Sequence, residues 1–289
     1  MFVDLPDGRR LEVQVGGPEQ GLPLVYHYGT PSGALLDDEM VDAAARRGLR
    51  TVVYSRPGYG DSTARPGRTV ADAAGDVAAV LDALGAGRFV TLGKSGGGPH
   101  ALACAALLPD RCAAAASVAG VAPYGPADLD WPAGMGPENV EEFQAALAGT
   151  AALTAFLTAQ VPVLSTVTGS DVATAFGELV SEVDRRALTG GFAEFVAATL
   201  RRSVEHGIAG WHDDDLAFVR DWGFPLGTGA VPVAIWQGGQ DRMVPYAHGQ
   251  WLAARYPSAR VHLLPAEGHL SLAVGAFGEI LDELVDLAG

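Results

Sequence analysis

The chain has 289 residues, of which 48% are hydrophobic and 18% are charged, a composition typical of a folded globular protein and unlike that of a disordered one. Acidic residues outnumber basic residues by 34 to 19, and the net charge of -15 would repel nucleic-acid phosphates and anionic membrane surfaces. We therefore expect a small molecule as the partner, and neither nucleic acid nor a membrane. Assembly into a homodimer is a further possibility.

No targeting segment is evident in the sequence. The first residues lack the apolar run of a secretory signal, and the most apolar stretch, 101–121, is interrupted by a Pro-Asp-Arg triplet. We therefore predict a cytoplasmic protein. The two cysteines, Cys104 and Cys112, have no further Cys or His at the spacing of a zinc site, so we expect them to be packing residues.

The first 124 residues alternate short β-rich runs with longer helical patterns. The chain opens with a predicted antiparallel hairpin, because residues 1–5 and 10–15 flank the turn dipeptide Asp7-Gly8. The predicted strands that follow are 24–27, 51–54, 89–92 and 113–119, and the predicted helices are 35–47, 70–84 and 99–108. This alternation indicates an α/β fold with a mostly parallel central sheet and helices on both faces.

The alternation stops near residue 125 and resumes near residue 230. The intervening sequence predicts helices without strands, most clearly at 141–157, 172–187 and 192–206. The later elements are a strand at 231–236, a helix at 247–255, a strand at 261–264 and a helix at 270–287. We therefore predict two parts of one core, 1–124 and 230–289, separated by a helical cap at 125–229.

A candidate nucleophile lies where a predicted strand meets the helix that follows. Residues 93–97 read Gly-Lys-Ser-Gly-Gly, a G-x-S-x-G pattern in the strand-turn-helix context that the nucleophile elbow requires. The glycines permit a sharp turn that projects the hydroxyl of Ser95. The start of the helix also directs backbone N-H groups and a positive dipole at the place where an oxyanion would form.

A serine hydroxyl is a weak nucleophile near neutral pH, so it needs a base and an acid that orients the base. The chain supplies Asp241 just past the strand 231–236, and His269 just past the last predicted strand. Because the carboxyl ends of parallel strands meet at one edge of a sheet, we expect Ser95, Asp241 and His269 to form a catalytic triad there. Glu267 is a weaker candidate acid, since it is too close to His269 in the chain to reach the far ring nitrogen.

Several further segments resemble one known family. Residues 28–31 read Tyr-Gly-Thr-Pro, 56–62 read Arg-Pro-Gly-Tyr-Gly-Asp-Ser, 239–245 read Gly-Gln-Asp-Arg-Met-Val-Pro and 268–272 read Gly-His-Leu-Ser-Leu. Together with the elbow, they are similar to the α/β-hydrolase superfamily and its single-cap serine hydrolase branch, over essentially the whole chain. The resemblance implies the α/β-hydrolase fold.

The resemblance also implies that the backbone N-H groups of Gly96 and Thr30 form the oxyanion hole. Two positions depart from the family pattern: Tyr28 stands where a histidine is usual, and Ser55 stands where an aspartate is common. In the family both positions support loops, so the departures concern loop geometry more than chemistry.

Lys94 is the only lysine of the chain, against 18 arginines, and it precedes the candidate nucleophile. We expect it either to be a structural or surface lysine, or to support the elbow through a carboxylate or carbonyl, or to bias the field at Ser95. Residues 213–215, a run of three aspartates, are interpreted as a solvated helix start rather than a metal site. The predicted substrate-binding residues are the aromatics Tyr28, Trp211, Trp222 and Phe224.

Ser95 indicates attack on a carbonyl, because branches of this superfamily that open epoxides or displace halide use an aspartate at the elbow. We therefore predict a carboxylic-ester hydrolase that acts on a small, largely apolar substrate through an acyl-enzyme, without a metal or organic cofactor. The same residues would also serve a lactonase, amidase, thioesterase, carbon-carbon bond hydrolase or acyltransferase. A ligand receptor without turnover also stays open.

Overall fold

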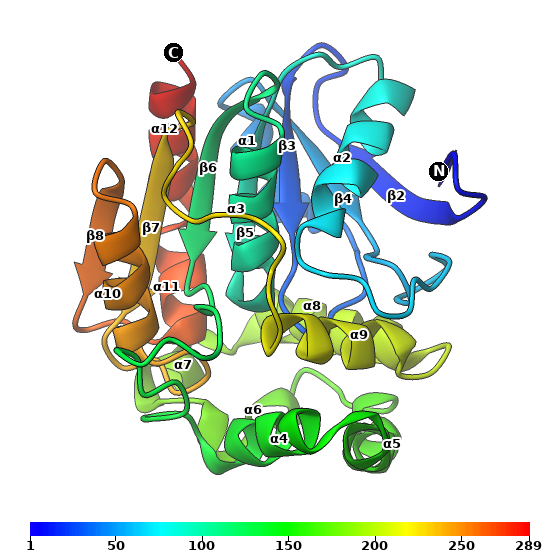
Figure 1. Ribbon diagram of the computed structural model, residues 1–289, viewed down its shortest axis with the longest axis vertical. Coiled ribbons are helices and arrows are strands. Elements are labelled where there is room, and N and C mark those ends of the chain that lie inside the picture. The colour runs from blue at the N-terminus through cyan, green and yellow to red at the C-terminus, as the bar shows by residue number, and fades with distance from the viewer.

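An eight-stranded sheet forms the centre of the computed structural model, which describes residues 1–289. The strand order is β1-β2-β4-β3-β5-β6-β7-β8; β1 pairs antiparallel with β2 and β2 antiparallel with β4, and all other neighbours are parallel. The strands are β1 (Phe2–Asp4), β2 (Arg10–Gly16), β3 (Leu22–His27), β4 (Leu49–Tyr54), β5 (Phe89–Lys94), β6 (Cys112–Val118), β7 (Val233–Gly238) and β8 (Arg260–Leu264). Figure 1 shows the parallel strands pointing toward the same edge of the sheet.

Helices cover both faces of the sheet, as expected for central strands that are apolar throughout. One face packs against α2 (Asp72–Ala83), α3 (Gly98–Leu107) and α10 (Tyr246–Arg255), and the other against α1 (Asp38–Ala45) and α12 (Phe277–Ala288) (Figure 1). Between β8 and α12 lies α11 (His269–Gly275). This α/β-hydrolase arrangement confirms the predicted fold class.

The segment from 125 to 229, which we call the helical segment, contains no strand. Its elements are α4 (Pro137–Ala148), α5 (Thr150–Leu164), α6 (Val172–Ala175), a 3₁₀ turn (Gly177–Leu179), α7 (Glu182–Ala187), α8 (Gly190–Val204) and α9 (Ala209–Phe218). In Figure 1 these helices lie beyond the carboxyl ends of the parallel strands, with α8 and α9 nearest the sheet. We propose that they form a cap over that edge.

Three of the predicted helices are divided, and a fourth helix has bounds that differ from the prediction. The segment 172–187 is divided into α6, the 3₁₀ turn and α7. The segment 141–157 is interrupted at Gly149, whose φ of 109° ends α4, and the segment 270–287 is interrupted at Ala276. The fourth is α9, which begins at Ala209 rather than at the helix start predicted for 213–215. Almost all of its residues are buried, so it lacks the alternation of apolar and polar faces that marks a surface helix.

None of the helices combines the length and the apolar character that crossing a bilayer requires. Cys104 and Cys112 are both buried and unpaired, and both belong to the core that packs α3 against the sheet. They are packing residues, as the sequence predicts.

Candidate active site

Ser95 lies at a strained turn between β5 and α3. Its φ of 58° is in the left-handed region, which residues with a side chain rarely adopt. The turn leaves no room for a side chain on either flanking glycine: a Cβ on Gly93 would lie 2.1 Å from Gly97 O, and one on Gly97 would lie 2.1 Å from His27 O. The G-x-S-x-G spacing is therefore a steric requirement of this turn, which places Ser95 in the wall of a cavity.

Asp241 and His269 meet across two neighbouring strands, Asp241 after β7 and His269 as the first residue of α11. His269 Nδ1 donates to Asp241 Oδ2 at 2.8 Å, and both side chains are buried. Asp241 Oδ1 accepts from the backbone N-H groups of Met243 and Val244 at 2.9 and 2.8 Å. Because a carboxylate only accepts, this bond places the proton of a neutral imidazole on Nδ1 and leaves Nε2 free to act as a base.

The loop 28–31 closes another side of Ser95. A Cβ on Gly29 would lie 3.2 Å from Ser95 Cβ, and one on Gly96 would lie 2.5 Å from Thr30 Oγ1, so the loop and the elbow are in direct contact. Thr30 and Gly96 both line the cavity beside Ser95, and the Thr30 N-H donates to no backbone acceptor. Ser95 Oγ makes no hydrogen bond to His269; in ligand-free enzymes such bonds often form only with substrate present.

A carboxylate of the helical segment holds the N-terminus of the helix that carries His269. Asp184, on α7, accepts from the backbone N-H groups of His269, Leu270 and Ser271 at 3.1, 2.7 and 3.0 Å. It also accepts from Ser181 Oγ at 2.8 Å, within the capping box that begins α7. Burial opposes this charge, but hydrogen bonds from Ser271 and Ser181 and the nearby His269 hold the pKa of Asp184 below its ordinary value.

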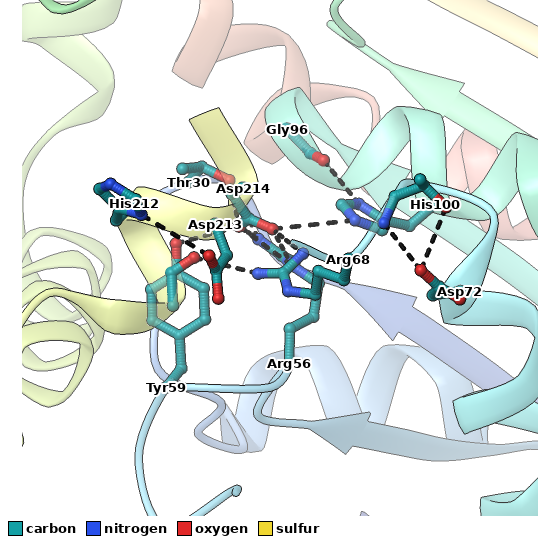
Figure 2. A network of polar contacts seen from close by, with 12 residues as sticks. Thr30, Arg56, Tyr59, Arg68, Asp72, Gly96, His100, His212, Asp213 and Asp214 are labelled. Carbon is teal, nitrogen blue, oxygen red and sulfur yellow. Dashed lines mark hydrogen bonds and ion pairs between the residues drawn. The ribbon is translucent and has the colours of Figure 1, made fainter. Parts of the chain in front are cut away.

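A buried ion pair joins the loop 28–31 to α9, as Figure 2 shows. The carboxylate of Asp214 is fully buried and lies 2.6 Å from both Arg56 Nη2 and Arg68 Nη1. Arg56 also donates to two carbonyl oxygens of the loop, at 2.6 and 2.9 Å, and Thr30 Oγ1 donates to Asp214 Oδ2 at 2.7 Å. The network therefore fixes the loop that carries Thr30.

His100 connects the same network to the elbow (Figure 2). Its Nδ1 donates to Gly96 O at 2.9 Å, and its Nε2 lies 3.8 Å from Asp214 Oδ1. Burial, aided by the charge of Arg56, lowers the pKa of His100 to about 3. The ring is therefore neutral and holds the carbonyl of Gly96 in place.

Comparison with known proteins shows the family of the chain. Residues 23–276 match the family model described as the alpha/beta hydrolase fold. The chain belongs to the α/β-hydrolase fold family.

The relatives of this α/β-hydrolase carry different names. It is 35% identical over 152 residues to a non-heme chloroperoxidase from Streptomyces lividans, covering 52% of this chain and 55% of the relative. It is 32% identical over 111 residues to epoxide hydrolase B from Mycobacterium tuberculosis, covering 37% and 31%. A solved α/β-hydrolase fold protein from Nakamurella multipartita has a TM-score of 0.69 at 26% identity, covering 100% and 99%. The alignments thus span about half or less of the curated relatives, whereas the fold is shared throughout.

The interpretation of residues 213–215 as a solvated helix start is wrong. All three aspartates lie in the interior of α9 and are buried, and Asp214 is the partner of two arginines in this α/β-hydrolase. Its burial has no local signal in the sequence, because the partners of Asp214, Arg56 and Arg68, are far away along the chain. No group of three His, Cys, Asp or Glu side chains is arranged to hold a metal ion.

The cavity beside Ser95 has a volume of about 40 Å³. Besides Ser95, Gly96 and Thr30, its walls are Val121, Met135, Asn139, Glu142, Phe143, Asp215, Phe218, Met243 and Val244. A larger, open depression of about 540 Å³ lies on the outer side of Asp241, but neither Ser95 nor His269 lines it. The smaller cavity is therefore the candidate substrate pocket of this α/β-hydrolase.

The predicted substrate-binding aromatics do not line this pocket. Trp222 and Phe224 stack on each other in the core, with ring centroids 6.0 Å apart. Tyr28 is buried and donates its hydroxyl to Leu35 O at 2.6 Å, and Trp211 lies behind the wall. These large aromatic side chains pack in the interior, and the sequence alone does not distinguish an aromatic residue of the core from one that lines the pocket.

Lys94 is half-buried and forms neither a hydrogen bond nor an ion pair. Burial lowers its pKa from 10.5 to about 8, against the opposing charges of Asp184 and Asp241. The expected charge-assisted bonds to the elbow are absent, so two hypotheses remain: a structural or surface lysine, and an effect on the field at Ser95. Ser55, which departs from the family pattern, donates its hydroxyl to Glu12 Oε2 at 2.8 Å and supports its loop.

We predict that Asp184→Ala lowers the free energy of unfolding by about 2 to 4 kcal/mol, because three N-H groups at the start of α11 lose a charged acceptor. Glu182→Ala, the control, removes an exposed carboxylate from the same helix and should change the free energy of unfolding by less than about 0.5 kcal/mol. Urea denaturation measures both.

The difference in the free energy of unfolding between the parent and Asp184→Ala should depend on pH. The pKa of Asp184 is lowered in the folded state, so its stabilisation is complete above the ordinary value of 3.8 and is lost as the pH falls below it. The difference between Asp184→Ala and the parent should therefore shrink in acid. A difference that stays constant, or that is absent near neutral pH, would contradict the role assigned to Asp184.

We predict that Asp214→Asn lowers the free energy of unfolding by about 3 to 5 kcal/mol, because Arg56 and Arg68 would remain buried without a counter-charge. Asp221→Asn, at an exposed position just beyond α9, is the control and should be close to neutral. Equal stability of the two variants would show that the buried ion pair does not hold the loop.

Proposed function

We propose that the protein is a serine hydrolase that cleaves a carboxylic ester of a small, largely apolar substrate through an acyl-enzyme. The observation that carries the proposal is the strained Ser95, with a φ of 58°, at the sheet edge where His269 is already held by Asp241. Strain of this kind is retained at functional sites, where the surrounding structure enforces it.

In the first half of the reaction, His269 Nε2 takes the proton of Ser95 Oγ as this oxygen attacks the ester carbonyl. The carbonyl oxygen becomes an oxyanion, for which the N-H groups of Gly96 and Thr30 are the proposed donors. When the tetrahedral intermediate collapses, the bond to the alcohol oxygen breaks and the alcohol leaves with the proton held by His269. Ser95 then carries the acyl group.

In the second half, His269 accepts a proton from water, which attacks the acyl-enzyme, and the proton is returned to Ser95 as the acid leaves. Asp241 keeps the imidazole in the required tautomer and offsets the charge that develops on it. These steps use only side-chain and backbone groups of the chain. They also distinguish the chain from hydrolases that attack saturated carbon with a carboxylate, because the residue at the elbow is a serine.

We predict that Ser95→Ala and His269→Ala each lower kcat/KM for 4-nitrophenyl acetate by about three orders of magnitude. The matched controls are Ser165→Ala and His206→Ala, both exposed residues of the helical segment, which should retain parental kcat/KM. Initial rates are measured by release of nitrophenolate. Near-parental turnover by either active-site variant would exclude this mechanism.

A further inference from the structure

Two carboxyl groups of the helical segment meet in the wall of the cavity beside Ser95. Glu142 comes from α4 and Asp215 from α9, and each lies within hydrogen-bond reach of the other. Asp215 is fully buried, and neither of its oxygens accepts from any N-H or hydroxyl group of the protein. Buried polar groups are nearly always satisfied, so this pair requires an explanation.

The two groups share one proton. Burial and the charge of Glu142 raise the pKa of Asp215 well above its ordinary value; Asp214 raises it further and Arg68 opposes the change. Burial also raises the pKa of Glu142, but Trp211 Nε1 donates to its carboxylate at 2.7 Å and favours the charged form. Because Asp215 has no such donor, the proton resides on Asp215 and the negative charge on Glu142.

The cavity lies on the side of Ser95 that receives the acyl group. Ser95, Gly96 and Thr30 line it, whereas His269 does not. The leaving alcohol takes its proton from His269 and must lie beside that ring, so the acyl chain extends the other way. A volume of about 40 Å³ restricts this chain to a few atoms, since a cavity needs about 10 to 15 Å³ of such space to hold one water molecule.

The negative charge in this cavity has no cationic partner within the protein. Apart from the protonated Asp215, Trp211 is the only side-chain donor to Glu142, and most of the remaining wall is apolar. A cation that enters would be attracted strongly, because little water is present to screen the charges. No third ligand completes a metal site, whereas a cation with N-H groups can donate directly to the carboxylate.

We propose that Glu142 and Asp215 bind an ammonium group carried by a short acyl part of the substrate. The proposal rests on the proposed function, because Ser95 as the nucleophile defines the acyl side. In place of a largely apolar acyl part, it specifies esters of small amino acids as the substrate class, with the ammonium held by the carboxyl pair while the ester carbonyl faces Ser95.

Two esters of the same shape test this specificity. L-Alanine methyl ester differs from methyl isobutyrate by an ammonium in place of a methyl group, and its amino group, with a pKa of about 7.7 to 8, is mostly protonated near pH 7. The measured quantity is the ratio of kcat/KM for the two esters in each protein. Differences in intrinsic reactivity cancel when this ratio is compared between the parent and its variants.

The double variant Glu142→Gln/Asp215→Asn removes the charge and retains the shape, and should lower the ratio about ten-fold or more. Glu142→Gln alone should lower it less, because the new amide can donate to Asp215 and stabilise a charge there. This single variant also provides the test if the double variant does not fold. Glu141→Gln, at an exposed position of α4, is the matched control and should leave the ratio unchanged.

A second measurement does not depend on turnover of the methyl esters. Isopropylammonium should inhibit the hydrolysis of 4-nitrophenyl acetate competitively in the parent, and about ten-fold more weakly in the double variant. Equal ester ratios together with equal inhibition in the two proteins would overturn the proposal. A preference seen only for acetylcholine over 3,3-dimethylbutyl acetate would place the cation on the alcohol side and also overturn it. Failure of the parent to hydrolyse any of these esters would instead refute the proposed function.

Discussion

The close approach of the backbone at residues 93–97 is the constraint on which the rest of the site depends. Without side chains on Gly93 and Gly97, the chain turns from β5 into α3 tightly enough to hold Ser95 in a left-handed conformation. The turn lies among the carboxyl ends of β3, β5 and β6, so the loop after β3 reaches Ser95 directly. The sheet order then brings the residues after β7 and β8 to the same edge.

The helical segment holds parts of the candidate site through two of its buried carboxylates. Asp184 accepts three backbone N-H groups from the helix of His269, and Asp214 joins the loop of Thr30 to two arginines. Burial alone would oppose the charged form of both carboxylates, but several donors stabilise each of them. A change in the packing of this segment is therefore coupled to the position of His269 and to the loop that carries Thr30.

Local patterns in the sequence were sufficient to predict the fold and to place Ser95, Asp241 and His269 just past the carboxyl ends of strands. The glycines around Ser95 and the placement of Asp241 and His269 after strands depend on short-range spacing, and the structure brings the last two into contact. Asp184 and Asp214 were missed because their partners lie 85 and 158 positions away, and no local signal pairs them. The aromatic residues are predicted to line the pocket from their apolar character, which favours burial in the core equally.

The central claim is that Ser95 is an activated nucleophile, and covalent labelling tests it most directly. The folded protein is treated with a fluorophosphonate, digested, and its peptides are mapped by mass spectrometry. The account predicts one phosphonyl adduct, on Ser95, which forms in the folded protein and is absent when the protein is unfolded in guanidinium before treatment. A folded protein that stays unlabelled, or that carries its adduct on a different serine, would contradict the account.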